Sequence, residues 1–123
     1  DPRLLDQVVS AGIAFEVCPA SNVQLGVYHS PSDVPLRRLL AAGAQVALGA
    51  DDPLLFLSRL TAQYETARTA HGLSDAELAA LARSSITASF AADADKARWL
   101  DEVDAWLLGS AHGTAGVGAT PGR

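Results

Sequence analysis

Two adjacent carboxylates, Asp51 and Asp52, are the side chains whose type and position in this sequence could most readily carry out chemistry. They follow a short apolar run and precede Pro53, which shapes the exit of the chain. Successive side chains of an extended segment point in different directions, so one aspartate could hold a cation while the other contacts a ligand. The same pair could instead cap a helix that begins at Leu54, where the helix dipole favours negative charge. The pair alone leaves a site and a helix cap both open.

A second polar segment, which includes Cys18, Ser21 and Asn22, follows another short apolar run. Serine and asparagine commonly form turns, and no nearby histidine would activate the Cys18 thiol. We therefore expect Cys18 to be a small buried apolar residue. If the two apolar runs are parallel strands, both polar segments leave the sheet at its C-terminal end, which is where α/β proteins gather ligands.

The three histidines, His29, His71 and His112, show neither His-x-His nor i, i+4 spacing, so they cannot form a metal site from adjacent ligands. His71 is best explained by a place at a helix C-terminus. The sequence has no glycine-rich phosphate loop after a strand and no Gly-x-Ser-x-Gly motif, which argues against these nucleotide-binding and serine-hydrolase chemistries. Trp99 and Trp106 lie seven residues apart on one helical stripe and are interpreted as packing residues.

The elements that must position the polar segments are two β-strands, predicted at the short apolar runs 13–18 and 44–49. A helix is predicted between them, from residue 32 or 33 to Gly43. A strand–helix–strand unit of this length predicts parallel strands joined by a right-handed crossover. Two parallel strands alone leave both sheet edges open, so the architecture requires more strands, which we expect upstream.

The other predicted elements are helical or irregular. Ser74 and Glu77 form a capping box, which predicts the start of a helix. The predicted set comprises a helix over 1–12, a polar loop over 19–32, a helix over 54–72, a helix from Ser74 to about Phe90, a helix from Asp93 or Asp95 to 108, and a disordered tail over 109–123.

Composition limits the class of protein. The chain has 123 residues, a formal net charge of −5, one cysteine and 49% hydrophobic residues, which is typical of a globular protein rather than a disordered one. Its acidic balance argues against nucleic-acid and membrane-surface partners, and no apolar run is long enough to span a bilayer. The single cysteine favours a reducing compartment, so we predict a cytoplasmic location. Because the chain contains no methionine, we expect it to be a piece of a longer protein.

Taken together, Cys-Pro-Ala-Ser-Asn and the later Asp-Asp-Pro resemble the C-terminal part of the adenosine deaminase family. Either motif alone would be weak, but the two at this separation are quite specific. The resemblance covers residues 1–108, and the segments that carry it are 17–26, 35–39, 48–53, 64–65 and 73–90.

The resemblance implies that residues 1–108 are the C-terminal portion of a (β/α)₈ barrel, with the last two parallel strands followed by C-terminal helices. By the same resemblance, Asp51 would be a ligand of a catalytic Zn²⁺ and Asp52 would contact the purine ring. Ser21 matches a position near the metal-bound water and would orient the ligands. The family's general-acid glutamate and its zinc-binding histidines would lie upstream, so no catalytic acid or base is expected in these residues.

The implied activity is zinc-dependent hydrolytic deamination of adenosine, and of deoxyadenosine, to the inosine nucleoside and ammonia. The substrate partner would be a small-molecule purine nucleoside, and oligomeric state is not predicted. One ligand cannot form a tight zinc site, so we expect the isolated chain to be inactive. Two alternatives remain open: a deaminase of adenine or another aminopurine, and a non-catalytic helical interaction module formed by residues 54–108.

Overall fold

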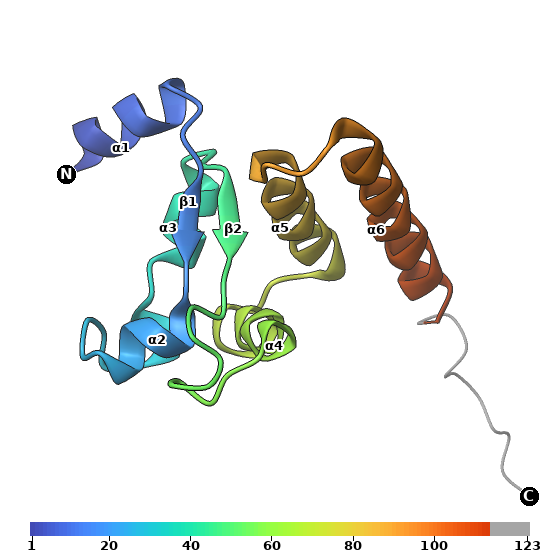
Figure 1. Ribbon diagram of the computed structural model, residues 1–123. Helices are drawn as coiled ribbons and strands as arrows, with labels where there is room; N and C mark the ends of the chain where they lie inside the picture. The colour runs from blue at the N-terminus through green and yellow to red at the C-terminus, as the bar shows by residue number, and fades with distance from the viewer. Residues whose placement is uncertain (114–123) are drawn as a thin grey trace, which may run out of the picture.

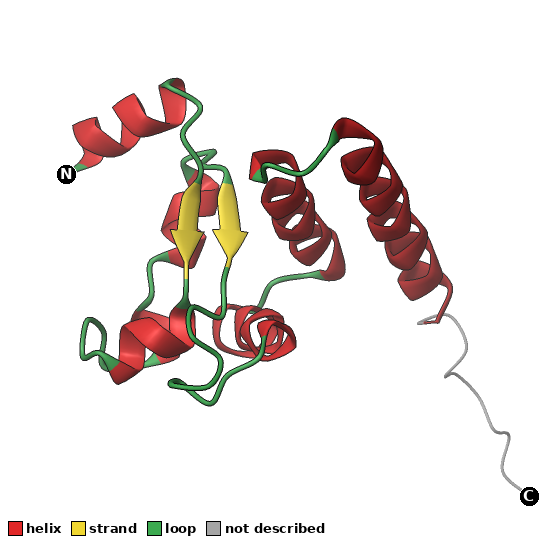
Figure 2. Ribbon diagram, viewed as in Figure 1, coloured by secondary structure: helices red, strands yellow, loops and turns green. Residues whose placement is uncertain are grey.

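The computed structural model describes residues 1–113, and Figure 1 shows their arrangement. Two short strands lie beside each other, with helices on one side and at both ends (Figure 2). In chain order the elements are α1 (Pro2–Ser10), β1 (Phe15–Val17), α2 (Pro19–Gln24), the 3₁₀ helix η1 (Pro31–Asp33), α3 (Leu36–Ala41), β2 (Val46–Leu48), α4 (Leu60–His71), α5 (Asp75–Ala88) and α6 (Asp93–Gly113).

The two strands are parallel, as the crossover predicted, and α3 connects them. Their pairing is extended at both ends by backbone hydrogen bonds, from Phe15 N–H to the Gln45 carbonyl and from Gly49 N–H to the Val17 carbonyl. Each strand has three residues, fewer than the predicted six. The register pairs Phe15 with Val46, Glu16 with Ala47, and Val17 with Leu48.

The core lies on one face of this sheet. Val46 and Leu36 are fully buried, and burying one such side chain stabilises a fold by about 1.5–3 kcal/mol. The buried cluster draws on the sheet, α3, α4, α5 and the segments beside them, so the strands and C-terminal helices share one core. Its members are Val17, Val34, Leu36, Ala44, Val46, Leu48, Ala67, Leu73, Leu78 and Leu81.

The other face of the sheet carries different residues. A Cβ placed on Gly49 would lie 2.9 Å from both Cys18 Sγ and Glu16 Oε1, so these three residues share that face. Within residues 1–113, Glu16 is exposed there. Parallel strands are normally covered on both faces, so this face agrees with the expectation that the complete sheet contains further strands.

Three predicted boundaries were wrong. Residues 19–24 form α2 instead of a loop, because Pro19 occupies the first helical position, where its missing N–H costs nothing. The helix expected from residue 32 or 33 begins only at Leu36, since Pro35 holds Val34 in an extended conformation. The helix expected from residue 54 begins at Leu60, because Leu57 has a positive φ of 47° that an α-helix cannot contain.

The C-terminal helices follow the capping signals more closely. The predicted capping box is present, with Ser74 Oγ accepting the Glu77 N–H and the Glu77 carboxylate accepting the Ser74 N–H. The predicted disordered tail was wrong for residues 109–113, which continue α6, and its remainder, 114–123, lies outside the described residues. None of the helices within residues 1–113 combines the length and the apolar character needed to cross a membrane.

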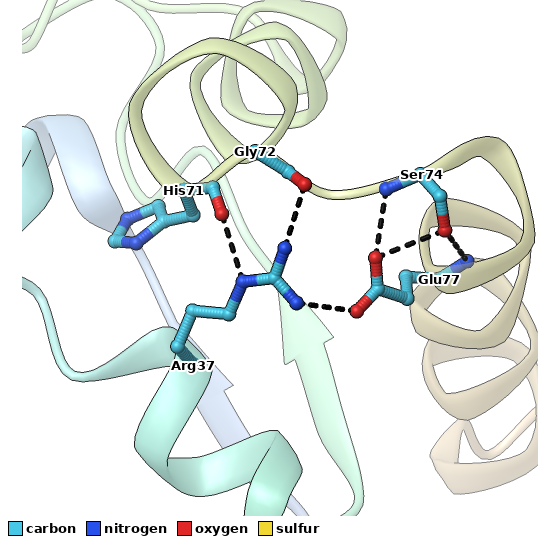
Figure 3. A network of polar contacts seen from close by, with 5 residues as sticks. All are labelled: Arg37, His71, Gly72, Ser74 and Glu77. Atoms are coloured by element: carbon cyan, nitrogen blue, oxygen red, sulfur yellow. Dashed lines mark hydrogen bonds and ion pairs between the residues drawn. The ribbon is translucent and has the colours of Figure 1, made fainter.

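Arg37 joins α3 to the α4–α5 corner, as Figure 3 shows. Its guanidinium donates from Nε to the His71 carbonyl (2.8 Å), from Nη2 to the Gly72 carbonyl (2.6 Å), and from Nη1 to Glu77 Oε1 (2.5 Å). His71 does lie in the last turn of α4, as predicted, but burial lowers the pKa of its imidazole. Arg37 and Arg68, which lies in the last turn of α4, therefore supply the positive charge at this helix end in place of a charged His71.

Candidate active site

The parallel strands bring Ser21 and Asp51 together at the C-terminal end of the sheet. Ser21 lies in the first turn of α2, after β1, and Asp51 follows β2. The Ser21 hydroxyl donates a hydrogen bond of 2.7 Å to Asp51 Oδ2. Because Ser21 is only 2% exposed, its hydroxyl is held by the surrounding chain and presents a fixed donor to the carboxylate. The two polar segments, which were expected to leave the sheet at the same end, are thus in direct contact there.

Asp51 has an unusual backbone conformation, with a φ of 57° in the left-handed region. Aspartate and asparagine tolerate this region better than most residues, yet it still costs about 1–3 kcal/mol. The bend lies two residues beyond Gly49 and turns the chain past the C-terminal end of β2. Asp51 also interacts with Cys18, whose pKa is raised by burial and by the nearby Glu16 and Asp51 carboxylates. Cys18 is therefore a protonated, partly buried thiol, which agrees with its predicted structural role.

The Asp52 carboxylate bonds to the turn that directly follows it. Its Oδ1 accepts hydrogen bonds from the Leu54 and Leu55 N–H groups, each at 2.9 Å. This is the capping behaviour that the sequence analysis left open, although the residues that follow form a turn rather than the first turn of a helix. The capping contacts fix the orientation of the carboxylate. The role of Asp52 in contacting a purine remains a prediction.

Two glutamines that the sequence analysis did not single out connect α2 to the loop after Asp52. Gln24 Nε2 donates to the Phe56 carbonyl at 2.7 Å. Gln63, from α4, accepts the Ala20 N–H on Oε1 at 3.1 Å and donates from Nε2 to Ser58 Oγ. Gln63 lies four residues before Ala67, and both are buried in α4. A polar residue at helical spacing from apolar ones is the sequence signal that could have identified it.

The other candidate residues lie elsewhere. His71 belongs to the Arg37 corner, His29 is an exposed loop residue, and the side chain of His112 lies outside the described residues. Trp99 and Trp106 line a cavity of about 500 Å³ between α4, α5 and α6, together with Tyr64 and Ile86. Neither Ser21 nor Asp51 lines this cavity, so it is separate from the site that these two residues form at the strand ends, called the strand-end site below.

The strand-end site offers one side chain of a type that can bind a metal. Within residues 1–113, no group of three or more His, Cys, Asp or Glu side chains could hold a metal ion. Asp51 offers a carboxylate, which is an established zinc ligand, and the Ser21 hydroxyl is the kind of neighbour that orients such a ligand. The donor chemistry therefore fits one ligand of a zinc ion, and a complete site needs two or three more.

Parallel strands backed by helices, with a carboxylate and a hydroxyl meeting at their C-terminal ends, are the arrangement expected of a portion of a (β/α)₈ barrel, and the solved structures that superpose on the chain bear this out. The family profile described as "Adenosine deaminase" matches residues 1–106. The chain belongs to this family.

Named relatives and solved structures agree with this assignment. The chain is 60% identical over 108 residues to a protein of Streptomyces coelicolor named "Putative adenosine/adenine deaminase", covering 88% of this chain and 32% of that protein. The crystal structure of an adenine deaminase from Arthrobacter aurescens superposes with a TM-score of 0.84 at 37% identity, covering 88% of this chain and 33% of the other. The N6-methyl-AMP deaminase of Arabidopsis thaliana gives a TM-score of 0.76 at 30% identity, covering 85% and 31%. The chain thus spans about a third of the length of these relatives.

Proposed function

We propose that the longer protein containing these residues is a zinc-dependent hydrolase that removes the amino group of a 6-aminopurine. In this reaction the oxygen of water bonds to the ring carbon that carries the amino group and the C–N bond breaks. One proton of the water leaves with the amino group as ammonia, and the other ends on the adjacent ring nitrogen of the product. The observation that supports the proposal is the 2.7 Å hydrogen bond between Ser21 and Asp51 at the C-terminal ends of two parallel barrel strands.

Each site residue then has a distinct task. Asp51 would be one of the zinc ligands and would accept a hydrogen bond or proton from the attacking water. Ser21 would hold the Asp51 carboxylate in one orientation through Oδ2. Asp52, whose carboxylate is fixed by the Leu54 and Leu55 N–H groups, would contact a nitrogen of the purine ring. When bound, the zinc ion would lower the pKa of water to about 7, so that hydroxide is available at neutral pH.

Adenosine, with deoxyadenosine, is the substrate that follows from the family resemblance. Adenine is a second candidate, favoured by the name of the Arthrobacter relative, whereas the name of the Streptomyces relative includes both substrates. The third alternative, an independent helical module, has less support, because Leu78 and Leu81 of α5 share a core with β2. We further propose a cytoplasmic enzyme that acts on a small molecule and has neither nucleic acid nor membrane as a partner.

The test is to purify the full-length protein, remove its metal by chelation, and measure ammonia release with adenosine, deoxyadenosine, adenine and adenosine monophosphate before and after zinc is restored. We expect zinc-dependent turnover of adenosine. A clear preference for free adenine would select the second candidate. Failure to deaminate any 6-aminopurine would reject the proposal. The 123-residue chain assayed in parallel should be inactive, because it supplies only one of the zinc ligands.

A further inference from the structure

Gln63 lies at the junction of the two segments that form the candidate site. It belongs to α4 and is only 1% exposed, so it is a fully buried polar side chain. Both ends of its amide are used: Oε1 accepts the Ala20 N–H, and Nε2 donates to Ser58 Oγ. A buried amide with both ends paired restrains the groups that it bonds, because breaking either contact would leave a polar group without a partner.

The contact with Ala20 compensates for a weakness of α2. The residue at the N-cap of this helix is Cys18, and no side chain of the N-cap residue accepts a hydrogen bond in the described structure. The first N–H groups of any helix need acceptors from outside the helix. Gln63, 43 residues further along the chain, supplies one of them. Its acceptor therefore fixes the helical turn in which the next residue, Ser21, directs its hydroxyl to Asp51.

The contact with Ser58 restrains the other half of the site. Ser58 is buried in the loop that follows Asp52, and its N–H donates to the Pro53 carbonyl. The buried amide of Gln63 therefore connects the loop that carries Asp51 to the helix that carries Ser21. Gln24 adds a third connection between the same two segments, through the Phe56 carbonyl.

We propose that Gln63 is a positioning residue for zinc binding, acting through the Ser21–Asp51 hydrogen bond. The inference rests on the proposed function only in taking Asp51 as a zinc ligand. It predicts that removing the amide weakens zinc binding even though Gln63 does not touch the metal. Groups that orient a metal ligand typically contribute 10- to 100-fold to metal affinity. Since Gln63 acts through an intermediate residue, we expect an effect at the lower end, about tenfold.

The test measures the zinc dissociation constant of the full-length protein by competition with a chromophoric chelator. Gln63→Met keeps the length of the side chain and removes both hydrogen bonds, so its dissociation constant should rise about tenfold. Gln63→Glu keeps an acceptor for the Ala20 N–H and lets the Ser58 hydroxyl donate instead, so it should restore most of the affinity. The matched control is Gln45→Met, which removes a hydrogen bond of 2.8 Å to Thr87 Oγ1 near the opposite end of β2. It should leave zinc affinity unchanged.

A double-mutant cycle distinguishes positioning from a general loss of stability. If Gln63 acts through Ser21, adding Gln63→Met to Ser21→Ala should change zinc affinity much less than it does in the wild type. Additive effects, or a Gln63→Met protein with wild-type affinity, would overturn the inference. If Gln63→Met does not fold, Ser58→Ala removes only the hydrogen bond between Gln63 and Ser58. An unchanged zinc affinity of the Ser58→Ala protein would overturn the inference equally. A wild type that binds zinc but deaminates no aminopurine rejects the proposed function and leaves this test valid, whereas a wild type without zinc affinity rejects both.

Discussion

Removing the Ser21 hydroxyl is the sharpest perturbation of the candidate site. Ser21→Ala deletes one oxygen from a side chain that is 2% exposed and leaves the methylene carbon in place, so it creates almost no cavity. What it removes is the 2.7 Å hydrogen bond to Asp51 Oδ2. A hydrogen bond to a charged group contributes about 1.5–3 kcal/mol. Asp51 is exposed in this chain, so water can replace part of the lost contact, and the lower end of that range applies.

An energy of about 1.5 kcal/mol corresponds to roughly a tenfold change in an equilibrium constant. We therefore expect Ser21→Ala to weaken zinc binding by the full-length protein about tenfold, measured by chelator competition at neutral pH. The control is Ser89→Ala, which removes a local hydrogen bond of 2.7 Å to the Ile86 carbonyl at the end of α5. A Ser21→Ala protein whose zinc affinity stays within twofold of the wild type would refute the claim that this hydroxyl orients a metal ligand.

Three other predictions concern Asp51, Gly49 and His71. Asp51→Asn keeps a residue type that tolerates the φ of 57° while removing the charge, so zinc-dependent turnover should be abolished in a folded protein; normal activity with retained metal would rule out the ligand role. Gly49→Ala places a Cβ 2.9 Å from Cys18 Sγ and Glu16 Oε1, and should lower the free energy of unfolding in urea by about 1–3 kcal/mol, with Cys18→Ala restoring most of the loss. Burial lowers the pKa of His71, so the folded protein favours the neutral imidazole. The contribution of this group to the free energy of unfolding should be fully present above the unfolded pKa of about 6.5 and decrease as pH falls below it. Urea unfolding at several pH values should show this loss, and His71→Gln should reduce it.

The backbone topology could be predicted from the sequence because its signals are local. Short apolar runs identified both strands, Ser74 and Glu77 identified the start of α5, and the length of the crossover identified the parallel arrangement. The exact strand lengths and the start of α4 could not be predicted from the sequence, because they depend on where backbone hydrogen bonding begins and ends. The left-handed conformation of Leu57, which delays α4, has no signal in a leucine.

The sequence predicted the residues of the site but not the residue that holds them in position. Asp51 and Ser21 stood out by position and family resemblance, and the structure places them in contact. Gln63 was not found, because a single polar residue in a helical stripe does not reveal which distant backbone group it bonds. Its partner Ala20 is 43 residues away and contributes only a backbone N–H, which every residue except proline has. Such contacts become visible only when the fold is known.

The strand register determines where the site tolerates insertions and deletions. Phe15 pairs with Val46 and Val17 with Leu48 because these side chains must face the same core. A slip of one residue along β2 would move its end by about 3.3 Å relative to β1, which exceeds the whole 2.7 Å distance between Ser21 Oγ and Asp51 Oδ2. It would also turn the apolar side chains away from the helices. An insertion or deletion within either strand should therefore be far more damaging than one in the crossover loops, because apolar packing sets the alignment of the polar pair.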